Sequence, residues 1–258
     1  MEKAATNLAT VFMPDGIGFV ELDDCTNFDW DVARIARVST GSENKGDKAD
    51  RRLLATLIRE DHGSPLEMGL IRFKLKMPLF LVVQLLRHRW ASFSQQSGRY
   101  VAFNVECYVP ADDDWRLQGE GNKQVSAGQL EPELAAMARQ LYTESVEKAI
   151  SAYYQLLGLG VAREQARIVL PQGIYVNLFA EFNMRSLMNL LRLRLAPDAQ
   201  PEFQLYAQAM FELVRWLCPK MHRLFKIVLE VEKRLSTERR AVWNELMEEW
   251  NGEEAEGC

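Results

Sequence analysis

The sequence predicts one α+β domain in which a small β-sheet packs against several long helices. Short stretches that alternate apolar and polar residues indicate strands, and longer stretches with apolar residues at helical spacing indicate helices. No repeat, low-complexity tract or linker divides the 258 residues, and 48% of them are hydrophobic, enough for a sizeable core. We therefore expect a single domain over residues 1–258, with a helical C-terminal extension from about residue 219.

The first quarter of the chain predicts a strand and two helices. Residues 16–25 alternate loosely between apolar and polar side chains, which is typical of a half-buried strand. Residues 29–41 and 49–61 place apolar side chains at helical spacing, and the first of these helices ends at a Ser-Thr-Gly turn.

The stretch 70–76 predicts a second strand with two unlike faces. Apolar residues alternate with cations there, so one face is expected to be buried and the other polar. The apolar residues are Ile71, Phe73 and Leu75, and the cations are Arg72, Lys74 and Lys76. Pro78 can begin a helix, and residues 79–86 are apolar on every side, which favours a helix buried between other elements.

The second half of the chain predicts mainly helices. Residues 110–130 are polar and without periodicity, which indicates a surface loop or lid, and 132–158 form a long helical pattern between a proline and a glycine. Residues 166–196 begin extended and end helical. A further helix spans 201–218, and two more helical patterns follow over 219–250.

Composition limits the classes of partner. A net charge of −5 provides no global basic field for nucleic acid or an anionic membrane, so any anion site must be local. The N-terminus lacks a signal-peptide pattern and no apolar run reaches the roughly 18 residues of a membrane span, which predicts a soluble, cytoplasmic protein. No metal site is predicted, because no cysteine or histidine cluster has metal-ligand spacing. The four cysteines are expected to be reduced thiols: Cys25, Cys107, Cys218 and Cys258.

Two stretches combine cations with a local absence of acids. Residues 68–105 contain no Asp or Glu, and neither do residues 182–197. The arginines there are Arg72, Arg87, Arg89, Arg99, Arg185, Arg192 and Arg194, with Arg163 and Arg167 upstream of the second stretch. The strand cations at 72–76 are expected to pair with acids elsewhere in the fold. Arg87, Arg89 and Arg99 are interleaved with serines and glutamines. This set of hydrogen-bond donors suits a phosphorylated small molecule.

Two residues in this segment raise the question of catalysis. His88 is one of only three histidines, and flanking cations would lower its pKa and keep it neutral, which favours a structural or binding role over proton transfer. Ser97 has no G-x-S-x-G context and no neighbouring acid to activate a base, so phosphate binding is favoured over nucleophilic attack. Residues 158–163 depart from the dinucleotide fingerprint and no P-loop is present, which excludes the common nucleotide folds.

The segment RHRWASFSQQSGRY, residues 87–100, resembles the signature of the flavin-dependent thymidylate synthases: Arg-His-Arg, seven residues, then Ser, with Arg-Tyr close behind. Further matching segments occur in the family's order over roughly residues 16–218. They are ARVSTG at 36–41, HGSPLE at 62–67, Gln84, ARIVLP at 166–171 and NMRSLMNLLRLR at 183–194.

The resemblance implies a fold and a reaction. Members of this family fold as an α+β domain and assemble as homotetramers whose shared active sites surround FAD. They convert dUMP to dTMP, with methylenetetrahydrofolate as the carbon donor and NADPH as the reductant. The protein then contributes orientation and electrostatics, while the cofactor carries out the redox chemistry.

The resemblance also implies roles for individual residues. Those expected to bind the flavin cofactor are Ser39, His62, Ser64, Arg87, His88, Arg89, Asn183, Arg185 and Asn189. Those expected to bind dUMP are Gln84, Gln95, Ser97, Gly98, Arg99, Arg167 and Arg194. Arg194 is also the expected catalytic residue, because a fixed cation facing the uracil ring can stabilise negative charge on a pyrimidine oxygen.

Three departures from the family pattern keep alternatives open. Met68 and Asp198 stand where members usually have histidine, and Gln95 stands where many have Glu. They can be neutral changes, or they can alter flavin contact, folate handling or product. One alternative is a relative that methylates or hydroxymethylates another pyrimidine nucleotide. A second alternative, from a different class, is a non-catalytic nucleic-acid-binding protein that uses the arginines of 87–99 with nearby aromatic rings.

Overall fold

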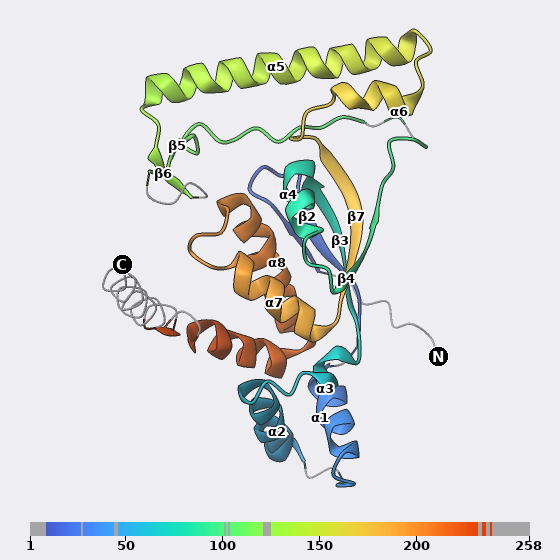
Figure 1. Ribbon diagram of the computed structural model, residues 1–258, viewed down its shortest axis with the longest axis vertical. Helices are drawn as coiled ribbons and strands as arrows, with labels where there is room; N and C mark the ends of the chain where they lie inside the picture. The colour runs from blue at the N-terminus through green and yellow to red at the C-terminus, as the bar shows by residue number, and fades with distance from the viewer. Residues whose placement is uncertain are drawn as a thin grey trace, which may run out of the picture.

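The computed structural model describes residues 9–231, except 27, 44–45, 101, 103 and 121–124, together with 234, 235 and 238. A five-stranded antiparallel sheet lies at its centre, with strand order β1-β2-β3-β7-β4 (Figure 1). The strands are β1 (Thr10–Phe12), β2 (Phe19–Cys25), β3 (Ile71–Pro78), β7 (Tyr175–Phe182) and β4 (Ala91–Gln95). The two predicted strands are confirmed as β2 and β3, whereas β1, β4 and β7 pair through contacts that no local pattern specifies.

The two faces of β3 differ as its alternation predicts. Ile71, Phe73 and Leu75 are completely buried. On the opposite face acids neutralise the cations. Arg72 pairs with Asp23 and Asp24 of β2 and Glu181 of β7, Lys74 pairs with Glu21 of β2, and Lys76 pairs with Glu106 of the loop between β4 and β5. The strand cations therefore belong to a polar sheet face and not to an anion site.

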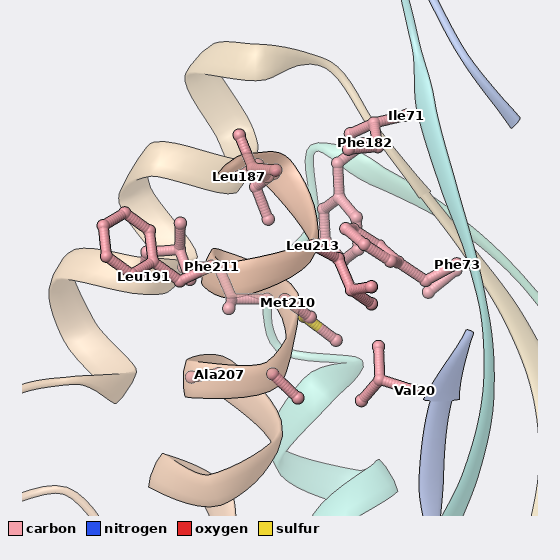
Figure 2. Packing of buried hydrophobic residues seen from close by; sticks show 14 of the residues in the cluster. Val20, Ile71, Phe73, Phe182, Leu187, Leu191, Ala207, Met210, Phe211 and Leu213 are labelled. Carbon is pink, nitrogen blue, oxygen red and sulfur yellow. The ribbon is translucent and has the colours of Figure 1, made fainter. Parts of the chain in front are cut away.

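Helices α7 (Met184–Arg194) and α8 (Pro201–Leu217) cover the apolar face of the sheet. Their apolar side chains interdigitate with Phe73 of β3 and Phe182 of β7, whose rings lie 6.4 Å apart at the centre of the core. Figure 2 shows Leu187 and Leu191 from α7 and Met210 from α8 in this layer. Burial of each such side chain stabilises the fold by roughly 1.5–3 kcal/mol, which explains why the helical stripes are directed at the sheet.

Three helices lie beyond one end of the sheet: α1 (Phe28–Val38), α2 (Asp47–Arg59) and the short α3 (Ser64–Glu67) (Figure 1). The first two confirm the predicted helices, and a buried ion pair between Arg37 and Asp50 joins them. The chain turns from α3 directly into β3.

Helix α4 (Leu79–Leu85) is confirmed in position but not in full burial. Its N-cap residue is Pro78, and Leu81, Val82 and Leu85 are buried. Val83 and Leu86 remain 48% and 44% exposed in the single chain. The expectation of a helix buried on every side is therefore wrong for the single chain. The reason is geometric, because this short helix lies on β3 and the described residues cover only its inner side.

The expected loop at 110–130 contains a small hairpin instead. Strands β5 (Arg116–Gln118) and β6 (Ser126–Gln129) form a two-stranded antiparallel sheet. The long helix α5 (Pro132–Gly158) follows as predicted and lies across one end of the molecule, beside α6 (Arg163–Ala166) and the 3₁₀ turn η1 (Arg167–Val169) (Figure 1). The helical turns over 163–169 correct the extended start expected at 166, but the predicted order of an extended stretch and then a helix is confirmed by β7 and by α7 (Met184–Arg194).

Residues 219–231 are helical, as expected for the start of the C-terminal extension. The buried carboxylate of Asp29 accepts hydrogen bonds from the amides of Lys220 and Met221, both at 2.9 Å, and so caps this helix. The expected helical pattern beyond residue 238 lies outside the described residues, as does Cys258. Cys25, Cys107 and Cys218 are free thiols. In the described part of the chain, no helix has the length and apolar character that spanning a bilayer requires.

Candidate active site

The ends of α4 and α7 bring together three predicted site residues. Gln84 lies in the last turn of α4, and a tight turn follows in which the His88 amide donates to the Leu85 carbonyl at 3.0 Å. Arg194 is the last residue of α7. Its Nε donates to His88 Nε2 at 3.1 Å and its Nη1 donates to Gln84 Oε1 at 3.2 Å. Gln84, His88 and Arg194 therefore form one hydrogen-bonded group.

Two residues at the start of α8 complete this group. Gln84 Nε2 donates to Gln200 Oε1 at 2.5 Å, and the Arg194 guanidinium lies over the ring of Phe203, 4.8 Å from its centroid. Gln200 and Phe203 are absent from the predicted site residues, since no local pattern connects position 84 with position 200. Together these contacts hold the partly exposed cation of Arg194 in one orientation.

The protonation state of His88 follows from its surroundings. The side chain is 8% exposed, and burial, with a further contribution from the charge of Arg194, lowers the pKa of His88 to about 4. His88 is therefore neutral near pH 7, and its Nε2 is free to accept the hydrogen bond from Arg194. The expectation of a neutral His88 is confirmed, although burial and Arg194, and not the flanking arginines, are the cause.

A second group of predicted residues lies where β4 ends. The amide of Gln96 donates to the Asn177 carbonyl at 2.9 Å, and a turn built on Ser97 follows, in which the Arg99 amide donates to Ser97 Oγ at 3.3 Å. Arg99 also forms an exposed ion pair with Glu164 of α6 at 3.2 Å. Exposed pairs of this kind contribute about 0–1 kcal/mol, so Arg99 remains available to an anionic ligand.

The turn after β4 is also joined to the segment that carries Arg167. Arg163 Nη1 donates to the Tyr100 carbonyl at 2.9 Å, and Arg167 begins η1 one helical turn later, where it is exposed. The structure thus brings α6 and η1 beside the end of β4 and the turn that follows it. The predicted members of this group are Gln95, Ser97, Gly98, Arg99 and Arg167.

A third group lies where α3 meets α7. Arg185 pairs with Glu67 at 2.8 Å and with Asp61 at 3.6 Å, and its guanidinium lies against Gly63, where any Cβ would collide with it. His62 and Ser64 flank that glycine and are exposed. Three of the residues expected to bind the flavin are therefore neighbours.

Local hydrogen bonds occupy two further members of the predicted flavin set. Asn183 is the N-cap of α7, and its Oδ1 accepts from the Ser186 amide at 2.8 Å. Asn189 Oδ1 accepts from Arg192 at 3.1 Å.

Ser39 is exposed just after α1, a helix that contacts α3. In the described part of the chain, Arg87 and Arg89 are exposed and no ion pair neutralises either of them.

The three groups do not form one enclosed site within the chain. The group at the ends of α4 and α7 lies on the side of the sheet that α8 covers, whereas α6 lies beside α5 at one end of the sheet and α3 lies beyond the other end (Figure 1). A hollow of about 530 Å³ between α5 and the loop before β5 contains none of the predicted site residues. Met68 and Asp198, which depart from the family pattern, are both exposed.

Comparison with known proteins connects this arrangement to one family. Residues 21–220 match the family model described as thymidylate synthase complementing protein. The flavin-dependent thymidylate synthase of Kosmotoga olearia is 38% identical over 208 residues, covering 81% of this chain and 90% of that relative. A flavin-dependent thymidylate synthase of Thermus thermophilus is 40% identical over 203 residues, covering 78% of this chain and 73% of that relative.

Solved structures show the same likeness. The crystal structure of a UMP/dUMP methylase, PolB, from Streptomyces cacaoi bound with 5-Br dUMP has a TM-score of 0.74 and 33% identity, covering 81% of this chain and 95% of that one. The same methylase bound with 5-Br UMP has a TM-score of 0.73 and 34% identity, covering 81% and 94% of the two chains. With the family model matched over most of the sequence, the chain belongs to the flavin-dependent thymidylate synthase family.

Proposed function

We propose that this protein catalyses the FAD-dependent reductive methylation of dUMP to dTMP, with methylenetetrahydrofolate as carbon donor and NADPH as reductant. The observation that carries the proposal is the group formed by Gln84, His88 and Arg194. There a neutral histidine and a glutamine oxygen orient an arginine that has no carboxylate partner among the described residues. Such a cation can stabilise negative charge that develops on a pyrimidine oxygen.

The other predicted substrate residues suit the phosphate and sugar of dUMP. Arg99 and Arg167 supply exposed cations, and the backbone turn at Ser97 and Gly98 supplies amide donors. Guanidinium groups and amides bind phosphate oxygens through charge-assisted hydrogen bonds. The absence of a base beside Ser97 among the described residues favours a binding role for its hydroxyl.

The residues expected to hold FAD suit its chemistry. Arg87 and Arg89 are exposed cations without an ion pair in the described part of the chain, which fits a ligand with two phosphates. The rest of the proposed flavin set is His62, Ser64, His88, Arg185, Asn183, Asn189 and Ser39. When bound, the flavin supplies the reducing equivalents, while the chain orients the pyrimidine and fixes the charge of Arg194 beside it.

We also propose a homotetramer with shared active sites. The two groups of proposed dUMP residues lie on different parts of the chain, one at α4 and α7 and the other beside α6 (Figure 1). In the proposed assembly, the group of one copy lies against the other group of a neighbouring copy, and the two together complete the site. Apolar side chains suited to such an interface are exposed on α4, at its C-cap and on α5: Val83, Leu86, Leu134, Met137 and Leu141. The free thiols support the proposed cytoplasmic location.

A second candidate is methylation of UMP. The solved relative is named a UMP/dUMP methylase and has been crystallised with analogues of both nucleotides. A nucleic-acid-binding role has less support, because ion pairs neutralise the strand cations and the net charge is −5.

The test begins with the absorption spectrum of the purified protein and its anaerobic reduction by NADPH, with and without dUMP. Bound FAD that NADPH reduces, and that is reoxidised only when dUMP and methylenetetrahydrofolate are both present, is the expected result. Mass analysis of products from dUMP and UMP then separates the two candidates. A colourless protein that FAD cannot reconstitute, with strongly salt-dependent binding to oligonucleotides, would refute the enzyme and favour the nucleic-acid-binding role.

A further inference from the structure

The side-chain amide of Gln84 is hydrogen-bonded at both ends. Its oxygen accepts from Arg194 Nη1 at 3.2 Å, and its nitrogen donates to Gln200 Oε1 at 2.5 Å. The reversed amide would direct its NH₂ group at the guanidinium, where two donors would face each other. The acceptor on Gln200 therefore selects the orientation in which Gln84 holds Arg194.

The position of Gln200 is in turn fixed by the start of α8. It is the N-cap residue, and its carbonyl accepts from the amides of Phe203 at 2.9 Å and Gln204 at 3.0 Å. The side chain of Gln204 donates to the carbonyls of Ala196 and Ala199, at 2.7 Å and 3.1 Å, and so holds the loop that leads into the helix. These contacts fix the backbone at Gln200, whose side-chain oxygen accepts from Gln84.

A buried ion pair connects the same turn of α8 to the hairpin. Glu202 is 7% exposed and pairs with Arg116 of β5, and the same carboxylate oxygen accepts from the Tyr108 hydroxyl at 3.5 Å. Removal of one partner from a buried pair leaves an uncompensated charge, so this contact keeps the first turn of α8 in place. The turn that carries Gln200 is thus anchored, and from it the side-chain oxygen of Gln200 accepts from Gln84.

We propose that Gln200 is a positioning residue for the pyrimidine nucleotide, acting through Gln84 on Arg194 without touching the substrate itself. The inference rests on the proposed function, because it assumes that Gln84 and Arg194 face dUMP. Loss of the Gln200 acceptor frees the Gln84 amide to rotate, and Arg194 then loses one of its two hydrogen-bonded restraints. Weaker nucleotide binding and slower turnover follow, with no change in the flavin.

The test is a double-mutant cycle in the FAD-loaded protein, read out as the dissociation constant of dUMP. The Gln200→Met variant keeps the length of the side chain but removes the acceptor, and we expect dUMP to bind about 10-fold more weakly. In a Gln84→Met background the same change is expected to alter binding less than about 2-fold, because a residue that acts through Gln84 has no effect without it. The Gln200→Glu variant retains an acceptor and is expected to bind within about 3-fold of the wild type.

Gln208→Met is the matched control, because Gln208 lies exposed on α8 and its side chain bonds, among the residues that the structure describes, only to Glu212, at 3.1 Å. FAD content and the midpoint of thermal unfolding are measured for every variant. Equal effects of Gln200→Met in both backgrounds, unchanged dUMP binding, failure of Gln200→Glu to restore binding, or loss of FAD or stability in Gln200→Met would each overturn the inference.

Two properties of the wild-type protein, dUMP binding and dTMP formation, distinguish failure of the proposed function from failure of the role of Gln200. A wild-type protein that binds dUMP but forms no dTMP overturns the proposed reaction and leaves the binding cycle to decide the role of Gln200. A wild-type protein that does not bind dUMP overturns both, since Gln84 would then have no nucleotide to orient.

Discussion

The buried neutral state of His88 makes stability depend on pH in a calculable way. The pKa of His88 is about 4 in the fold, against an ordinary value of 6.5. As pH falls through that interval, the unfolded chain binds a proton that the folded chain excludes, so the folded state is stabilised above about pH 6.5 and loses that stability progressively down to about pH 4. Below about pH 4 both states are protonated and this contribution stops changing.

The size of the effect follows from linkage. Between pH 7.5 and pH 5, the proton bound only by the unfolded state lowers the free energy of unfolding by about 2 kcal/mol, or about 1 kcal/mol if solvent near the site screens the charge. Protonation also removes the acceptor for Arg194 Nε, so dUMP binding is expected to weaken over the same interval. The assay is urea unfolding of wild type and His88→Asn at both pH values and at a fixed protein concentration.

The difference between the two proteins isolates His88 from other titrating groups. Burial also lowers the pKa of His222, which contributes with the same sign, and His222→Asn therefore serves as a parallel variant. The expected result is a decrease in stability on acidification that is about 1–2 kcal/mol smaller in His88→Asn than in wild type. Identical decreases in the two proteins would refute the argument that His88 is held neutral by burial and by Arg194.

Three further variants test other parts of the structure. Ser97→Ala is expected to keep measurable turnover but to weaken dUMP binding about 10-fold, because one hydroxyl contact is lost; complete loss of turnover with intact dUMP affinity would contradict the binding role. Arg194→Ala is expected to lower kcat about 10²–10³-fold, because the cation beside the pyrimidine is removed; an unchanged kcat would exclude its placement there. Asp29→Ala is expected to destabilise the fold by about 1–3 kcal/mol in urea unfolding, because a buried cap of residues 219–231 is lost. Unchanged stability of that variant would show that the extension does not depend on this cap.

Sequence reasoning found the site residues more readily than their arrangement. Gln84, His88 and Arg194 were identifiable because they belong to segments that resemble the family, and the structure joins them by hydrogen bonds. Gln200 and Phe203 were missed as site residues, because their importance comes from contact with positions far away in the chain. For Gln200 a signal was available, since it keeps the glutamine of the His-Ala-Gln pattern that is usual in the family after the Arg194 segment. The distribution of the remaining site residues over α3, β4 and α6 likewise depends on how the strands pair.

Several elements of this fold follow from local signals in the amino-acid sequence. The alternation in β3 separated a buried face from a cationic face, and prolines marked the starts of α5 and α8. These features depend on side-chain spacing and backbone geometry within a few residues. Three other features follow only from the packing of distant segments: β7 lies between β3 and β4, α4 keeps one side exposed, and Gln84 bonds to Gln200. Each of these depends on which distant segments meet when the apolar face of the sheet is buried, and no short stretch of sequence records that choice.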